Sequence, residues 1–156
     1  MKEKKTWIER VSDTEDDWVR ASRLEREGRY EEASKYYLKD AEKERNPAMA
    51  ALSYLSAAKC LAKVGKKEAA KYFRLAAENY RKYAEETVGI SPTSAVWGYL
   101  TASKCYMWAE DEEKAKEYME KARALADRLE IKPPSMEISG DVPLFKAYRR
   151  RRKSPS

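Results

Sequence analysis

The segment Tyr54-Leu-Ser-Ala-Ala-Lys-Cys-Leu61 recurs 45 residues later as Tyr99-Leu-Thr-Ala-Ser-Lys-Cys-Tyr106. The register continues through three further equivalent pairs: Ala70 and Ala115, Phe73 and Tyr118, and Ala77 and Ala122. A shift of 37 residues extends the pattern backwards, relating Leu55, Ala58, Leu61, Gly65, Ala70 and Phe73 to Trp18, Ala21, Leu24, Gly28, Ala33 and Tyr36. An internal repeat of this length is typical of stacked helix pairs, none of which buries its apolar face alone.

Turn and capping residues divide the repeats into six expected helices. Starts and stops are predicted at Ser12 to Glu15, Gly28, Asn46-Pro47, Gly65, Ser91-Pro92, Asp111 and Pro133-Pro134. The helix pairs then cover about 13–46, 47–88 and 91–131, with a small residue in each helix for close approach. Residues 1–12 are an N-terminal extension, and 132–156 are a proline-containing linker, a short amphipathic segment and a basic tail.

The composition excludes several kinds of catalytic and metal site. The 156 residues include no histidine, so Ser-His-Asp, Cys-His and His-based zinc sites are absent. The two cysteines, Cys60 and Cys105, occupy equivalent repeat positions, which usually lie about 10 Å apart on stacked helices, beyond the roughly 7 Å limit of a disulfide. We expect two buried free thiols, no metal, no cofactor and no enzymatic activity.

The repeat resembles a known family. Gly28-Arg-Tyr30-Glu-Glu-Ala33-Ser-Lys-Tyr36-Tyr37 is similar to the tetratricopeptide repeat, in which Gly-x-Tyr precedes the second helix and Ala and an aromatic residue follow. The later pairs depart from it, since Lys67 and Glu112 replace the tyrosine and Glu110 replaces the glycine. The resemblance implies an all-α fold: a right-handed α-solenoid of three antiparallel helix pairs with a C-terminal tail or short capping helix. The long repeats are similar to those of soluble NSF attachment proteins.

The same resemblance implies a concave groove lined by the first helix of each pair. The groove residues are Trp18, Leu55, Lys59, Lys63, Trp97, Leu100, Lys104 and Trp108. Lysines beside large apolar side chains suit an acidic protein or peptide partner with apolar anchors. The alternative is that the apolar residues are core and the lysines a solvated edge. The leading hypothesis is a non-catalytic protein-interaction or scaffold module.

The C-terminal tail supports a second hypothesis. Of the 33 basic residues, six lie in the last eleven positions, where there is no acid, and the remaining 27 equal the 27 acids. Five are consecutive: Arg149, Arg150, Arg151, Arg152 and Lys153. They could anchor a nucleic-acid-associated or ribosome-associated factor, or form a solvated terminus. Upstream, Leu144, Phe145 and Tyr148 share one face of a short helix that could cap the last pair.

The sequence also bears on location. No apolar run approaches the roughly 18 residues of a membrane span, and the first residues lack the apolar stretch of a signal peptide. We expect a cytoplasmic protein without a membrane span. Self-association into a homo-oligomer stays open.

Overall fold

The computed structural model describes residues 16–132, and this range is entirely helices and turns, with no strand. The helices are α2 (Asp17–Arg26), α3 (Tyr30–Lys43), α4 (Pro47–Lys63), α5 (Ala69–Thr87), α6 (Pro92–Trp108) and α7 (Glu112–Arg128). The prediction of an all-helical chain is confirmed for this range. The extension 1–12, the expected cap at Ser12 to Glu15 and everything from Pro133 onward, including the capping helix and basic tail, lie outside it.

The predicted helix starts are found where capping residues and prolines meet. Pro47 and Pro92 both occupy the first turn of a helix. The Asn46 side chain accepts hydrogen bonds from the backbone N–H of the next turn, and Ser91 and Asp111 do the same for α6 and α7. These caps satisfy amide groups that have no partner inside the helix. Three of the six helices within residues 16–132 therefore begin at the residues that the sequence predicts.

Four helix ends share one backbone turn. The turn residues Gly28, Gly65, Glu110 and Glu130 have φ of 78°, 71°, 63° and 53°. After each, an N–H bonds back to the carbonyl five residues earlier: Arg29 to Leu24, Lys66 to Leu61, Asp111 to Tyr106, and Ile131 to Ala126. This is the Schellman motif, which favours glycine because positive φ strains other residues. After the first three turns the chain reverses and packs a new helix against the old one.

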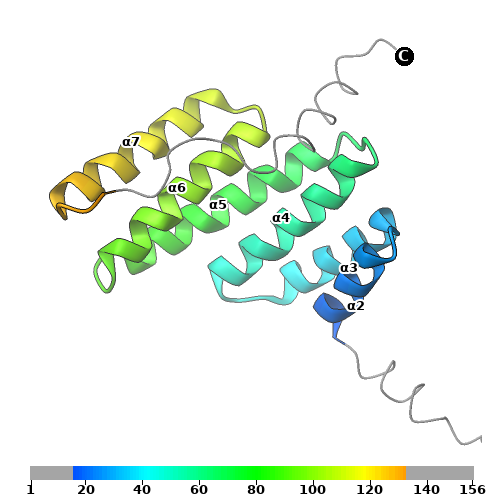
Figure 1. Cartoon of the computed structure of the whole chain (residues 1–156). Coiled ribbons are helices and arrows are strands. Elements are labelled where there is room, and N and C mark those ends of the chain that lie inside the picture. Colours follow the sequence, from blue (N-terminus) through cyan, green and yellow to red (C-terminus); the bar gives the residue numbers. More distant parts are fainter. Residues whose placement is uncertain (1–15, 133–156) are drawn as a thin grey trace, which may run out of the picture.

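Each helix packs mainly against its neighbours in the sequence. Figure 1 shows the helices in chain order, from α2 at one end to α7 at the other. Small side chains lie at the contacts: Ala21, Ala58 and Ser103 in the first helices of the pairs are all fully buried. Gly98 brings α6 so close to α5 that an added Cβ would lie 2.9 Å from the Cβ of Ala84. In the 45-residue repeat, α4 and α6 are equivalent helices.

The core departs from strict repeat equivalence in the first and middle pairs. In α5 the fully buried small residue is Ala69, whereas Ala70, the expected one, is half-buried. In α3 the buried aromatic is Tyr37, and Tyr36 is half-buried instead. Residues equivalent to Tyr36 pack in the core at Phe73 and Tyr118.

A substitution in the next helix accounts for the half-buried Tyr36. Phe73 is covered by the ring of Trp108 in α6, with 5.7 Å between ring centroids. At the position equivalent to Trp108, α4 has Lys63. Because Lys63 offers no ring there, the face of Tyr36 is taken by the cations of Arg20 and Lys39, at 5.2 and 5.0 Å.

Candidate functional site

The most distinctive surface combines α4 and α6 and is called the inner wall below. Each helix presents three residues there at the same spacing: Leu52, Ser56 and Lys59 from α4, and Trp97, Thr101 and Lys104 from α6. Positions separated by four and then three residues share one helix face. The two triplets are 45 residues apart and therefore equivalent in the repeat.

The two lysines of the inner wall both influence the pKa of the buried Cys105 thiol. Burial raises the pKa of the Cys105 thiol to about 12, and the positive charges of Lys59 and Lys104 both oppose that rise. The Lys59 ammonium also lies 5.7 Å from the centre of the Trp108 ring. Both lysines are half-buried, so their stems lie along apolar surface. Both of these predicted groove residues therefore lie within electrostatic range of Cys105.

The other end of the wall is apolar. Trp97 is 47% exposed, although its ring makes T-shaped contacts with Tyr80 and Tyr83 of α5, at centroid distances of 5.6 and 6.3 Å. Leu52 is 38% exposed at the equivalent position of α4. Leu52 is absent from the groove predicted from the sequence. Its equivalence to Trp97 in the 45-residue repeat is the signal that could have identified it.

Three residues assigned to the groove are buried instead. Leu55, Leu100 and Trp108 are only 9%, 3% and 7% exposed. Trp108 packs on Phe73 in the main core. The prediction that these three residues line the groove as exposed anchors is therefore wrong. They are core residues, as the alternative interpretation of the sequence has it. Helical spacing alone cannot distinguish a core residue from a groove residue here, because a helix packed between neighbours is apolar on most sides.

The remaining groove residues lie toward the first pair. Trp18 is half-buried against Tyr37, with ring centroids 5.0 Å apart. Lys63 is exposed and lies over the ring of Tyr30, 4.6 Å from its centre, with its Nζ 3.5 Å from the Tyr30 hydroxyl. Both therefore contact the α3 side rather than Lys104.

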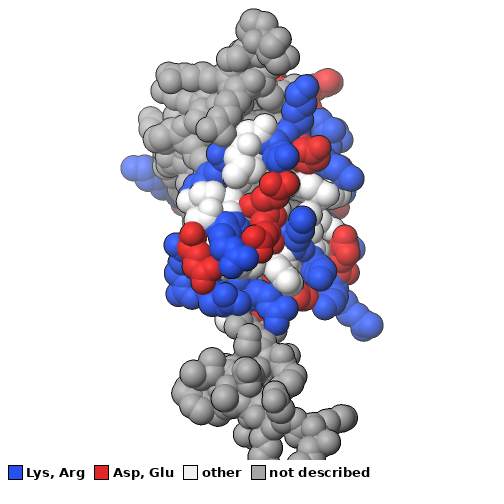
Figure 2. Space-filling view, turned by 90° about the vertical axis from the view of Figure 1, so that its right-hand side faces the viewer, with Lys and Arg blue, Asp and Glu red and all other residues white. Residues whose placement is uncertain are grey.

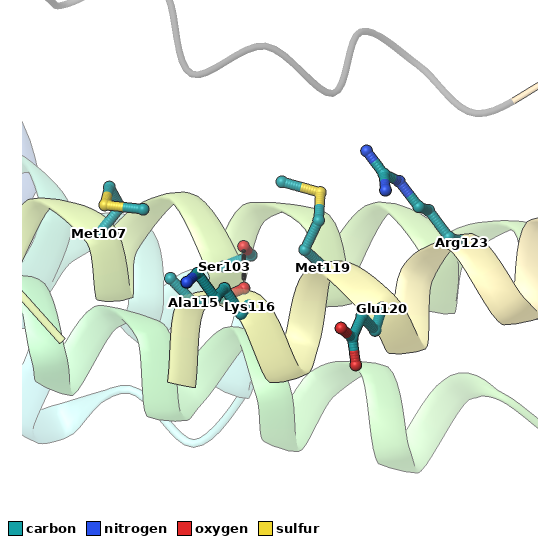
Figure 3. Close-up of a pocket in the computed structure, with 7 residues that line it drawn as sticks. All are labelled: Ser103, Met107, Ala115, Lys116, Met119, Glu120 and Arg123. Carbon is teal, nitrogen blue, oxygen red and sulfur yellow. Dashed lines mark hydrogen bonds between the residues drawn. The ribbon is translucent and has the colours of Figure 1, made fainter. Parts of the chain in front are cut away.

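A second surface feature lies between α6 and α7 and is called the α6–α7 hollow below (Figure 3). It has a volume of about 160 Å³ and is lined by Ser103, Met107, Ala115, Lys116, Met119, Glu120 and Arg123. At its floor the Ser103 hydroxyl donates a hydrogen bond of 2.6 Å to the carbonyl of Ala115. The methionines make the hollow apolar, and charged side chains lie at its rim.

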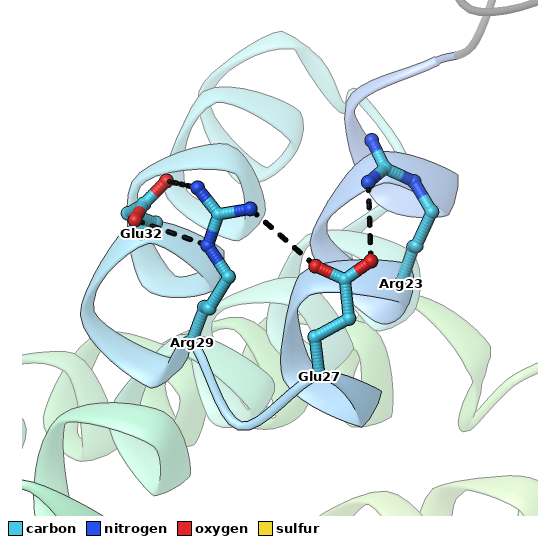
Figure 4. A network of polar contacts seen from close by, with 4 residues as sticks. All are labelled: Arg23, Glu27, Arg29 and Glu32. Atoms are coloured by element: carbon cyan, nitrogen blue, oxygen red, sulfur yellow. Dashed lines mark hydrogen bonds and ion pairs between the residues drawn. The ribbon is translucent and has the colours of Figure 1, made fainter.

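The face shown in Figure 2 mixes both signs of charge. At the turn between α2 and α3, Glu27 lies between Arg23 and Arg29, at 3.5 and 3.4 Å, and Arg29 also binds Glu32 at 2.7 Å (Figure 4). Hydrogen bonding to Glu32 is the main cause that raises the pKa of Arg29. Exposed ion pairs of this kind contribute little to stability by themselves.

Residues 16–132 contain no group of three or more His, Cys, Asp or Glu side chains arranged to hold a metal ion. No helix in that range has both the length and the apolar character needed to cross a membrane. Cys60 and Cys105 are free and buried, as expected. The basic tail lies outside the described residues.

Comparison of the chain with protein-family models, with curated proteins and with solved structures gives no significant match.

Proposed function

We propose that the chain is a non-catalytic protein-interaction module, built as a right-handed α-solenoid of three helix pairs similar to tetratricopeptide repeats. Support comes from the internal repeat, from the buried small residues in successive first helices, and from the Schellman turn that joins the helices of each pair. In the cytoplasm, where thiols stay reduced, Cys60 and Cys105 would serve only as small core residues.

The partner of this module is an acidic segment with at least one apolar anchor, bound along the inner wall. The observation that carries the proposal is the pairing of Lys59 and Lys104 at one end of the wall with the exposed Leu52 and Trp97 at the other. Exposed aromatic side chains supply contact area, and lysines supply charge complementarity and faster association. The T-shaped contact of the Trp97 ring with Tyr80 holds the anchor side chain in place.

Selection from a displayed library of random peptides tests the proposal without a known partner. We expect the selected peptides to be rich in Asp and Glu next to Leu, Phe or Trp. Reversing the charge of both lysines, in Lys59→Glu/Lys104→Glu, should lower the affinity for those peptides by at least about tenfold, because attraction becomes repulsion. Removing the apolar side chains, in Leu52→Ser/Trp97→Ser, should lower the affinity as well.

The matched control is Lys35→Glu/Lys82→Glu, which reverses two exposed lysines on the second helices α3 and α5. Its peptide affinities should stay near those of the parent. Peptides that bind the wall variants and the control equally would refute the inner wall as the binding surface. Selection of basic peptides, or of none, would refute the partner chemistry.

A further inference from the structure

The α6–α7 hollow lies beside the point where the described chain ends. We propose that residues 136–142 of this same chain, Met136-Glu-Ile-Ser-Gly-Asp-Val142, occupy the hollow as an extended strap, with Ile138 between the two methionines and Glu137 beside Arg123. The capping helix predicted around Leu144 to Tyr148 is the competing occupant. Direction, reach and charge each favour the strap.

The turn at the end of α7 sets the direction. Glu130 has a φ of 53°, and Ile131 bonds back to Ala126, as in the three turns that join the helices of each pair. In those three turns the chain reverses and runs back along the preceding helix. The same turn at Glu130 reverses the chain at Ile131. A chain that continued in this direction would run back along α7 toward the hollow.

The contacts of Ile131 show on which side of α7 the chain leaves. Ile131 packs against a cluster that includes Val96 of α6 and Ala126 of α7. Val96 lies on the same face of α6 as Ser103 and Met107, seven and eleven residues later. Ala126 likewise follows Met119 by seven residues on α7. The chain therefore leaves at one end of the seam that contains the hollow.

The distance from there to the hollow is short. Met119 precedes Ala126 by seven residues, which is about 10 Å at 1.5 Å per helical residue. The six residues from Pro133 to Ile138 span up to about 20 Å when extended. Pro133-Pro134 also favours an extended backbone over a helix. The chain from Pro133 to Ile138 is therefore long enough for Ile138 to reach Met119.

The rim charges distinguish between the two occupants. The rim has two bases, Lys116 and Arg123, and one acid, Glu120. Residues 133–142 carry two acids, Glu137 and Asp141, and no base, whereas the predicted helix 144–148 carries one base, Lys146, and no acid, and five further bases follow it directly. An acidic strap complements the rim, and a basic helix is repelled by it. Since the strap is tethered, its effective concentration is in the mM range, so even a contact with a dissociation constant of about 1 mM would be half-occupied.

Methyl NMR of the full chain, labelled at Ile δ1, Leu δ and Met ε, tests the proposal. We expect NOEs from the Ile138 methyl to the ε-methyls of Met107 and Met119. Glu137→Lys and Arg123→Glu should each lower the docked population by about threefold, as expected for an exposed ion pair. The combined swap, Glu137→Lys/Arg123→Glu, should restore it.

The control pairs Glu137→Lys with Lys121→Glu, which alters an exposed lysine on the opposite side of α7 from Met119. This pair should not restore docking. NOEs from the hollow to Leu144, NOEs that appear only between chains in a mixed-label sample, or no NOE to Ile138 would each overturn the strap. None of these results bears on the inner wall, whose peptide binding is measured separately.

Discussion

The equivalent helices α4 and α6 share a sequence segment but differ in how tightly they fit their surroundings. Tyr54 stacks on Tyr72, with ring planes 8° apart, and Tyr99 stacks on Tyr118, with planes 13° apart. At other equivalent positions α4 has Ser53, Ala58 and Lys63 where α6 has Gly98, Ser103 and Trp108, and the turns that follow have Gly65 and Glu110. Ser53, Ala58, Ser103 and Trp108 are all buried. The differing residues therefore adjust how each helix packs against its neighbours.

The tightest contact is expected to give the largest effect on stability. Gly98→Ala should destabilise the fold by about 2 kcal/mol, because overpacking outweighs the gain of about 1 kcal/mol in helix propensity. The new Cβ would meet the Cβ and Cα of Ala84, which cannot rotate away. Urea unfolding of the variant measures this change.

The control for this substitution is Gly89→Ala, where a Cβ would have nothing within 4 Å. Its unfolding midpoint should stay close to that of the parent. Equal midpoints for the two variants would mean that α5 and α6 are not in close contact at Gly98.

The equivalent thiols are expected to titrate alike and to make stability fall at alkaline pH. Burial raises the pKa of both Cys60 and Cys105 from 9.0 to about 12. Their contribution is thus complete below pH 9.0 and is lost as pH rises toward 12, by about 1 kcal/mol per thiol per pH unit. Urea midpoints of the parent and Cys105→Ala, measured from pH 8 to 10, should show a shallower fall for the variant. Parallel curves would contradict the burial of this thiol.

The sequence predicts the fold well where backbone chemistry acts locally. Pro47, Pro92, Gly28 and Gly65 mark helix ends through fixed or positive φ, which needs no tertiary context. The repeat then identifies which helices are equivalent. Glu110 adopts the glycine-like turn all the same, because the packing of α6 on α7 holds the chain there.

The candidate site is harder to predict, because exposure depends on neighbouring helices. Leu55 and Leu52 are both apolar residues of α4, yet only Leu52 is exposed. Which face is covered depends on the approach of α5 and α6, and small residues such as Gly98 set that approach. The α6–α7 hollow depends on two separate helices, and no motif in either one indicates it.

The turn between α6 and α7 gives a smaller effect that sharpens the comparison with α4. Glu110→Gly should stabilise the fold by about 0.5 kcal/mol, since relief of about 1–2 kcal/mol of positive-φ strain exceeds the extra entropy of the unfolded glycine. Glu113→Gly, the same change within α7, should destabilise it by about 1 kcal/mol. Thermal unfolding compares the two, and a loss of stability in both would show that the turn at Glu110 is unstrained.

The smallest change in stability is expected at the inner wall, where we expect the largest change in binding. Lys59→Glu/Lys104→Glu replaces two half-buried lysines and removes the contact of Lys59 with the Trp108 ring. The free energy of unfolding should change by less than about 0.5 kcal/mol, because charges near the surface contribute little to folding. The Cys105 pKa should rise further in this variant, since two opposing positive charges become negative, but the thiol stays protonated at neutral pH. If the variant instead loses several kcal/mol, the two lysines support the core, and any weaker peptide binding would reflect unfolding rather than a lost contact. Unchanged stability with weakened peptide binding would place their role at the surface.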